Sequence, residues 1–194
     1  MRSSLNFALF AALAATLAAT LAPALSWADF PGRKSGLWES VSTGAGMPET
    51  KVKECVDQAA DKAAVGNPKS PPGQKCKVDS SQGTASGFEA QISCDMPGTK
   101  MVVKSSGAGD FNSAVTYTVD TSFEPPFMGQ SSSRITINAK YLGACPAGVQ
   151  PGDVEMQNGV KYSRADQERM AKQAQEAMNS PEMQAAMKRA GSAQ

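Results

Sequence analysis

The sequence predicts a mainly β fold of the α+β class: a curved antiparallel meander sheet with one short helix and a C-terminal amphipathic helical tail. Three observations lead to this prediction. Apolar and polar residues alternate along several short segments, and Gly, Pro and Ser separate these segments at short intervals. From residue 163 onward, the apolar residues change to helical spacing. Strict alternation is typical of strands with one buried and one wet face, which antiparallel sheets commonly contain.

Seven segments have the character of strands. The alternation is clearest in the last two, where Val115, Tyr117 and Val119 share one face and Ile135 and Ile137 share one face of the next strand. Short Gly- and Ser-rich links join neighbouring segments, which favours antiparallel pairing because parallel neighbours need a long crossover. The predicted strands are 36–43, 51–56, 75–81, 87–95, 100–106, 114–122 and 134–142.

The inward face of this sheet is predicted from its large apolar side chains. The candidate inward residues are Trp38, Tyr117, Ile135, Ile137 and Tyr141. Each of these residues is expected to fill the core or to line a concave binding face.

Helices and loops are predicted between and after the strands. The Ala-rich segment 56–65 is expected to form a short helix, and the Pro-rich segments 67–73 and 124–129 are expected to be loops. Residues 147–162 are expected to be a linker.

The tail, residues 163–194, is predicted to form two helices. Ser163 and Asp166 have the spacing of a helix N-terminus, and Ser180 followed by Pro181 predicts the start of a second helix. The apolar residues at helical spacing are Met170, Ala174, Met178, Met183 and Met187. This methionine stripe is expected to cover the sheet or to bind a partner.

Residues 1–28 are predicted to be a cleaved signal peptide. Arg2 precedes a long Ala/Leu run, and Ser26 and Ala28 suit a peptidase that accepts small side chains. Cleavage after Ala28 is expected, with cleavage after Ala24 as the alternative. A domain over 29–146 then precedes the linker and the tail, and the expected location is the periplasm.

The four cysteines, Cys55, Cys76, Cys94 and Cys145, are predicted to form two structural disulfides. Four cysteines allow three pairings. Cys76 and Cys94 are symmetric about the turn near Ala85, so they are expected to face each other on adjacent strands. That pairing leaves Cys55 for Cys145. Redox and zinc roles are disfavoured because no C-x-x-C motif or closely spaced pair occurs.

Charge and composition exclude several classes of function. Without residues 1–28, the chain keeps 18 basic and 18 acidic residues, because Arg2 is the one charged residue lost. This balance argues against nucleic-acid binding and against a polybasic membrane patch, and no stable membrane anchor is expected after cleavage. Histidine is absent, and no carboxylate pair has a catalytic spacing, so no enzymatic activity and no cofactor are expected.

The ten methionines suggest one alternative function. Met thioethers can bind Cu(I), so periplasmic copper handling is the second hypothesis. Packing explains the tail methionines more simply, and no metal-binding residues are assigned.

An ordered set of landmarks resembles a domain-of-unknown-function family of proteobacterial periplasmic proteins. The landmarks are Gly36-Leu37-Trp38-Glu39, Met47-Pro48, the four cysteines and Tyr141-Leu142-Gly143-Ala144-Cys145. The resemblance covers about residues 32 to 146. It implies export and a cysteine-stapled sheet, and it brings no substrate and no catalytic residues.

These observations together predict an exported, non-enzymatic binding or envelope-interaction protein. Its expected partner is an apolar small molecule or another envelope protein, bound by the concave face of the sheet or by the helical tail.

Overall fold

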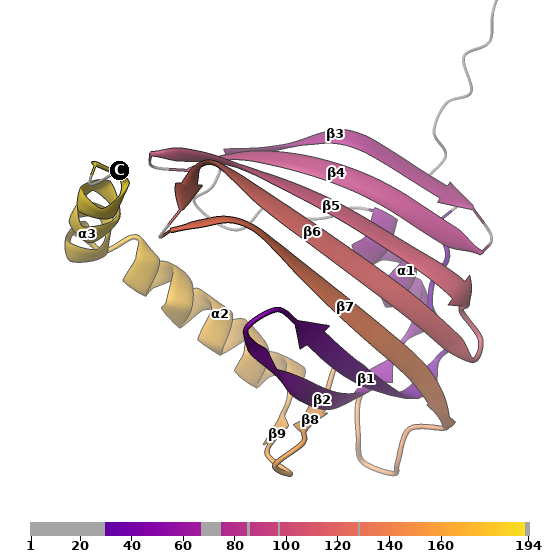
Figure 1. Ribbon diagram of the computed structural model, residues 1–194. Coiled ribbons are helices and arrows are strands. Elements are labelled where there is room, and N and C mark those ends of the chain that lie inside the picture. Colours follow the sequence, from indigo (N-terminus) through magenta and orange to yellow (C-terminus); the bar gives the residue numbers. More distant parts are fainter. Residues whose placement is uncertain (1–29, 67–74, 85, 97, 128, 193–194) are drawn as a thin grey trace, which may run out of the picture.

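The computed structural model describes residues 30–66, 75–84, 86–96, 98–127 and 129–192. These residues form one open antiparallel sheet of nine strands in the order β3-β4-β5-β6-β7-β1-β2-β8-β9, with three helices (Figure 1). The elements are β1 (Gly36–Gly44), β2 (Met47–Val56), α1 (Gln58–Gly66), β3 (Lys75–Thr84), β4 (Gly87–Met96), β5 (Thr99–Asp110), β6 (Ala114–Phe127), β7 (Gln130–Gly143), β8 (Val154–Met156), β9 (Lys161–Tyr162), α2 (Arg164–Met178) and α3 (Pro181–Ser192).

The mainly β fold class and the seven predicted strands are confirmed, and all seven strands are longer than predicted. β6 continues through the Pro-rich segment as far as Phe127, although the loop was predicted to begin at residue 124. Pairing with β7 passes from Ser122–Ser132 directly to Phe127–Gln130, because Pro125 and Pro126 cannot donate to the ladder. The predicted leader 1–28 with its cleavage site and the predicted loop 67–73 lie outside the described residues.

The segment 147–162 is not a simple linker, because it adds two short strands to the sheet. β8 pairs with β2, and β9 pairs with β8. The backbone of Cys55 also donates to Asp153 O and accepts from Gly152 N, at 3.1 and 2.7 Å. The segment therefore covers the free edge of β2.

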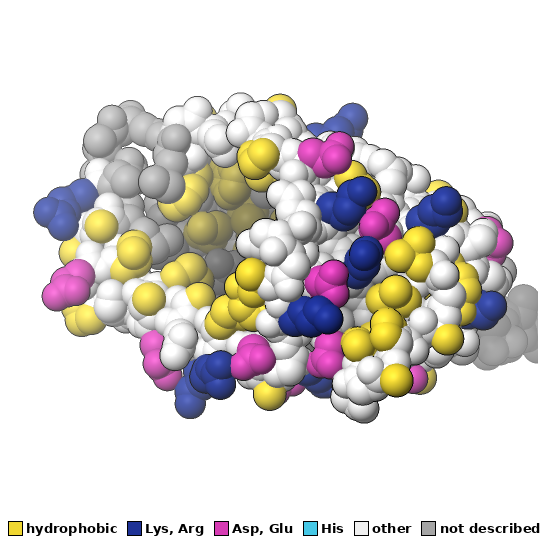
Figure 2. Space-filling view, turned by 90° about the horizontal axis from the view of Figure 1, so that it is seen from below, with side chains coloured by type: hydrophobic (Ala, Val, Ile, Leu, Met, Phe, Trp, Pro, Cys, Tyr) yellow, Lys and Arg dark blue, Asp and Glu magenta, His cyan; other side chains and the backbone are white. Residues whose placement is uncertain are grey.

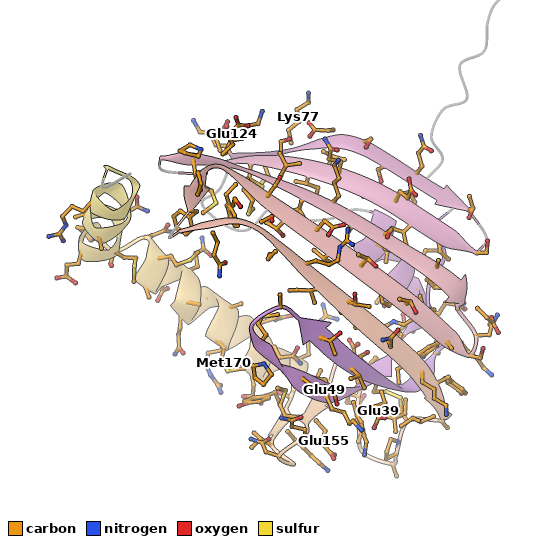
Figure 3. The ribbon with its side chains drawn as sticks, viewed as in Figure 1. Glu39, Glu49, Lys77, Glu124, Glu155 and Met170 are labelled. Atoms are coloured by element: carbon orange, nitrogen blue, oxygen red, sulfur yellow. A yellow bond between two sulfur atoms is a disulfide. The ribbon has the colours of Figure 1, made fainter. Side chains whose placement is uncertain are left out.

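The outer, convex face of the sheet carries rows of alternating charge. The pairing registers place basic and acidic residues directly opposite each other on successive strands, an arrangement that stabilises antiparallel pairs. In Figure 3, the labelled Lys77, Glu124, Glu39 and Glu155 lie on this outer side. The rows are Lys75–Asp95–Lys100–Glu124, Lys104–Asp120–Arg134 and Lys140–Glu39–Lys53–Glu155–Lys161.

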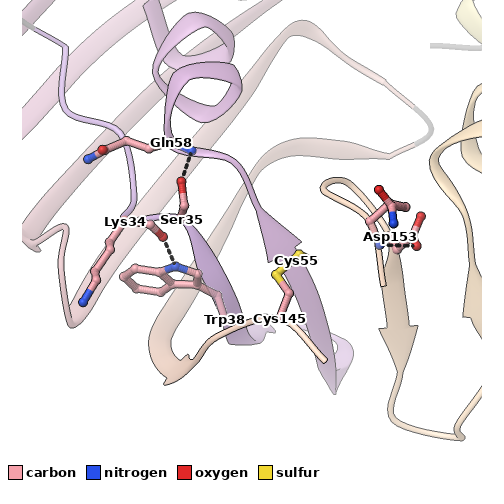
Figure 4. Close-up of a disulfide and its surroundings, with 8 residues drawn as sticks. Lys34, Ser35, Trp38, Cys55, Gln58, Cys145 and Asp153 are labelled. Atoms are coloured by element: carbon pink, nitrogen blue, oxygen red, sulfur yellow. Dashed lines mark hydrogen bonds between the residues drawn. A yellow bond between two sulfur atoms is a disulfide. The ribbon is translucent and has the colours of Figure 1, made fainter. Parts of the chain in front are cut away.

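The hydrophobic core occupies one end of the concave face. Trp38 is fully buried there, and its ring contacts Tyr141 edge to face with 5.6 Å between centroids. The indole N–H donates to Lys34 O at 2.7 Å, which satisfies the polar atom of the ring (Figure 4). The cluster consists of Trp38, Val56, Phe111, Val115 and Ala139, with Phe88, Tyr117 and Tyr141 packed against it.

The segment before β1 and helix α1 close this end of the sheet. The Arg33 guanidinium binds Asp61 of α1 at 2.6 Å and Glu54 of β2 at 3.0 Å. The backbone of Gln58, the first residue of α1, donates to Ser35 Oγ at 3.0 Å (Figure 4). Val56 is still paired with Gly36 in the sheet, and the Asp57 carboxylate accepts from Ala60 N at 2.9 Å, so the helix begins at Gln58 and not at residue 56 as predicted.

The two disulfides join the same pairs of cysteines that were predicted from their spacing in the sequence. Cys76 and Cys94 are directly opposite each other on β3 and β4, with 4.0 Å between their Cα atoms. Cys55 of β2 is bonded to Cys145 just after β7, with 5.6 Å between Cα atoms (Figure 4). The second bond ties strands that are two positions apart in the sheet, across β1.

The two edges of the sheet are poorly suited to pairing with another strand. β9 has only two residues, and β3 has a bulge between Val78 and Ser80. Short and bulged edge strands offer few aligned N–H and C=O groups to a further strand.

The tail forms helices α2 and α3, as predicted. Ser163 caps α2 through a capping box: its hydroxyl accepts from Asp166 N, and the Asp166 carboxylate accepts from Ser163 N, both at 3.1 Å. Within the described residues, no helix is both long enough and apolar enough to cross a membrane.

Candidate functional site

The second half of the concave face carries apolar side chains that the core does not cover. The registers place these residues on the same face as Val115, but they are only partly buried. We call this set the apolar patch: Ile92, Met101, Val103, Val119, Phe123 and Ile135. Val78 of β3 continues the patch and is 44% exposed.

The start of β5, the end of β6 and the start of β7, which carry most of the apolar patch, lie at the end of the molecule where α3 is found (Figure 1). Figure 2 shows a hollow at that end with hydrophobic side chains on its floor. On the described positions of β4 to β7 that face the same way as Val115, no side chain is charged. The polar groups there are hydroxyls, for example those of Ser105 and Thr121. The charges of these four strands instead lie on the convex face.

The predicted inward residues all share the concave face, but they divide between core and patch. Trp38 is in the core, with Tyr117 and Tyr141 packed around it. Ile135 belongs to the patch, and Ile137 is a partly exposed residue between patch and core. The aromatic residues therefore hold the sheet together, and the isoleucines extend toward the open end.

Burial at the core end affects the pKa values of two side chains, Tyr117 and Arg33. Desolvation raises the pKa of Tyr117 to about 12, although the nearby Arg33 opposes this shift. For Arg33, burial lowers the pKa, but the hydrogen bond to Asp61 and the attraction of Asp61 and Glu54 outweigh burial and leave the pKa above its usual value. Tyr117 is therefore a neutral phenol and Arg33 a cation at neutral pH.

The inward residues predicted from the sequence lie on β1, β6 and β7, whereas β4 and β5 also contribute side chains to the apolar patch. β4 contributes Ile92 and β5 contributes Met101 and Val103. A signal was present, because Phe88, Ala90, Ile92 and Cys94 alternate with polar residues along β4. The predicted cross-strand position of Cys94 then identifies which set of alternating residues shares the disulfide face.

The tail methionines are exposed. Met170 and Met178 of α2 are each 41% exposed, and Met183 of α3 is 43% exposed; the side chain of Met187 lies outside the described part. Met170 and Met178 are eight residues apart, about 12 Å along a helix axis, so one Cu(I) ion could not bind both. Within the described residues, no group of three or more His, Cys, Asp or Glu side chains is arranged to hold a metal ion.

Other pockets have a different chemistry. A pocket of about 440 Å³ lies between α1, β2 and the start of α2, and Glu54, Asp57, Asp61 and Arg164 are among its lining residues. Another pocket, of about 560 Å³, is lined by residues of 146–163 together with Leu37 and Lys53. The linings of both pockets contain charged side chains, whereas the apolar patch contains none.

Comparison with known proteins gives one match. The model of the family described as "Protein of unknown function (DUF3617)" matches residues 33–145, a range that begins at Arg33 and ends at Cys145. It contains β1 to β7 and therefore the apolar patch, while β8, β9, α2 and α3 follow it. No curated protein and no solved structure matches the chain. Because the match covers more than half of its 194 residues, the chain belongs to the DUF3617 family of proteins of unknown function.

Proposed function

We propose that this protein is exported to the periplasm and acts there as a non-enzymatic binding protein for an uncharged apolar molecule or the apolar part of an amphiphile. The observation that carries the proposal is the apolar patch on the floor of a hollow. A sheet face that is both apolar and concave, and that its own core leaves partly open, has the character of a small-molecule site.

The distribution of charge supports this choice of ligand. The convex face carries rows of alternating charge and is suited to water, whereas the residues of the apolar patch carry no charge. A buried anion or cation would be left without a partner on the patch. The ligand group that enters the hollow is therefore apolar, and any charged group stays at the opening.

Export is supported by the leader-like sequence and by the cysteines. All four cysteines are paired in disulfides, and disulfides of this kind persist in oxidising compartments. The intact mass of the protein from a periplasmic extract tests this part. Loss of residues 1–28 and of four hydrogen atoms is expected, while a full-length reduced chain in the cytoplasm would contradict export.

Binding is tested by titration with N-phenylnaphthylamine, an uncharged dye that fluoresces in apolar surroundings. We expect a saturable signal from the wild type and an affinity about tenfold lower for Ile135→Gln, because the amide must be desolvated on the patch. Arg134→Gln is the matched control, since the neighbouring side chain lies on the convex face.

The outcome of this titration is decisive. No saturable dye binding by the wild type would contradict the proposed function. Equal affinities of the Ile135→Gln and Arg134→Gln proteins would place the dye elsewhere and would equally contradict a site on the patch. Native mass spectrometry then identifies the natural ligand as an extra mass that is lost on denaturation.

A further inference from the structure

Helix α2 is hydrogen-bonded to the sheet domain near its first turn. The Gln167 side chain donates to Gly152 O at 2.7 Å, and the backbone of Arg164 donates to Asp153 Oδ1 at 3.3 Å. Gly152 and Asp153 are in turn hydrogen-bonded to Cys55 of β2. These contacts fix which side of α2 faces the domain, namely the side that carries Gln167.

The apolar residues of α2 lie on this same side. Met170, Ala171, Ala174 and Met178 follow Gln167 at intervals of three, four, seven and eleven residues, which places them on one helix face. We call this set the methionine face. The charged residues Arg169, Lys172 and Glu176 fall on the opposite side of the helix.

The methionine face is directed toward the domain but is not packed against it. Met170 and Met178 are each 41% exposed, and α2 contains no buried residue. An apolar helix face that points toward a domain and still remains this exposed is not packed against the described residues of that domain. In Figure 2, hydrophobic side chains line both the floor of the hollow and the rim where the tail helices lie, and Figure 3 labels Met170 on α2.

We propose that the methionine face of α2 is the second wall of the binding site, and that the ligand is a flexible apolar chain, such as the acyl chain of an amphiphile, held between α2 and the apolar patch. This inference rests on the proposed function and specifies its ligand. Both walls are uncharged, and Met170 and Met178 are about 12 Å apart along the helix, so the space between the walls is elongated.

The chemistry of methionine suits a flexible chain. Its unbranched thioether side chain has several rotatable bonds and adapts to irregular apolar surfaces. The opposite wall consists of stiffer Ile and Val side chains on a sheet. A flexible ligand chain is therefore held between the stiff side chains of the apolar patch and the adaptable side chains of the methionine face. The polar end of the ligand stays outside the hollow.

The first test measures affinity for dansyl-labelled undecanoic acid, a fluorescent single-chain amphiphile. The Met170→Gln/Met178→Gln protein is expected to bind about tenfold more weakly than the wild type. The matched control is Lys172→Gln/Glu176→Gln, which changes the opposite side of α2 and leaves the net charge unchanged. Because α2 has no buried residue, all of these proteins are expected to fold.

The second test measures oxidation of Met170 and Met178 by hydrogen peroxide, followed by peptide mass spectrometry. Saturation with the same probe is expected to slow oxidation of both residues several-fold in the wild type. The Ile135→Gln protein, with its weakened floor, serves as the control at the same probe concentration and is expected to show less protection.

The outcomes separate this inference from the proposed function. Dye binding at the patch combined with unchanged probe affinity in Met170→Gln/Met178→Gln and unchanged methionine oxidation would overturn the second wall alone. Dye binding without any binding of the dansyl chain would overturn the choice of a flexible chain. Failure of the wild type to bind either compound would overturn both proposals.

Discussion

Asp61 receives hydrogen bonds from both the backbone and the side chain of Arg33. The Arg33 backbone N–H donates to Asp61 Oδ2 at 2.7 Å, and the guanidinium donates to Asp61 Oδ1 at 2.6 Å. Only 11% of the Arg33 side chain and 12% of the Asp61 side chain are exposed, so both charges depend on each other for solvation. This one carboxylate therefore fastens α1 to the segment that precedes β1.

Replacement of Asp61 by Asn is expected to lower the free energy of unfolding by about 2–3 kcal/mol. The loss leaves the largely buried Arg33 cation with Glu54 as its remaining carboxylate, and breaking a buried pair on one side is strongly destabilising. Urea unfolding followed by circular dichroism measures the change. Asp120→Asn, which breaks the exposed pair with Arg134, is the control and should have a much smaller effect. Equal losses in the free energy of unfolding would show that the Arg33–Asp61 pair stabilises the protein no more than an exposed ion pair does.

Gly107→Ala is expected to destabilise the protein by about 1–3 kcal/mol, although Ala usually replaces Gly in a strand with a gain in stability. A Cβ at position 107 would overlap the Phe88 ring and lie 3.0 Å from the Tyr117 ring. Phe88→Leu in the same chain should restore part of the loss in a urea unfolding experiment. A single variant as stable as the wild type would mean that the two rings move aside freely.

Alkaline pH is expected to destabilise the protein through Tyr117. Burial raises the pKa of this phenol to about 12, against 10.0 for the unperturbed group. Between about pH 10 and pH 12, the unfolded chain binds fewer protons than the folded chain, so the free energy of unfolding falls as the pH rises. Below that window the contribution of Tyr117 is complete.

The measurement compares urea unfolding of the wild type and of Tyr117→Phe across this pH range. The wild type should lose stability more steeply than the variant, because other groups that titrate there are common to both. Parallel pH profiles would show that Tyr117 does not contribute.

Removal of α2 and α3 is expected to leave the stability of the sheet unchanged. A chain that ends at Tyr162 loses no buried side chain of α2 and keeps β8 and β9. A chain that ends at Pro146 also loses β8, β9 and the backbone bonds to Cys55, and is expected to unfold at lower urea concentration and to aggregate. Comparable losses in the two truncated chains would show that the tail helices stabilise the sheet.

Most of the sheet could be predicted from the sequence because alternation carries the information on burial. Val115, Tyr117 and Val119 lie on one face, and the predicted partners Cys76 and Cys94 are directly opposite each other. Strands β8 and β9 were missed because three and two residues cannot show a period. The end of β5 and the start of β7 were missed because backbone pairing continues through Gly- and Ser-rich sequence without any need for apolar side chains, and β6 was predicted too short because its pairing resumes at Phe127, after the two prolines.

The candidate site was predictable only in part. Alternation indicates that Ile135 and Trp38 share a face, but it does not show that one is partly open and the other completely buried. That difference depends on α1 and the segment around Arg33, which cover only one end of the concave face. Likewise, the spacing of Met170 and Met178 predicts one helix face, while the contact of Gln167 with Gly152 decides where that face points.

The unequal edges of the sheet bear on how this protein behaves at high concentration. One edge ends in a strand of two residues, and the other is bent by the bulge at Val78 and Ser80. For a second molecule, one edge offers only two residues and the other a row that is interrupted by a bulge, and both features disfavour extension of the sheet from one molecule to the next. The two longest strands, β6 and β7, which have fourteen residues each, both lie inside the sheet with a neighbour on either side, so their long rows of backbone groups are already paired.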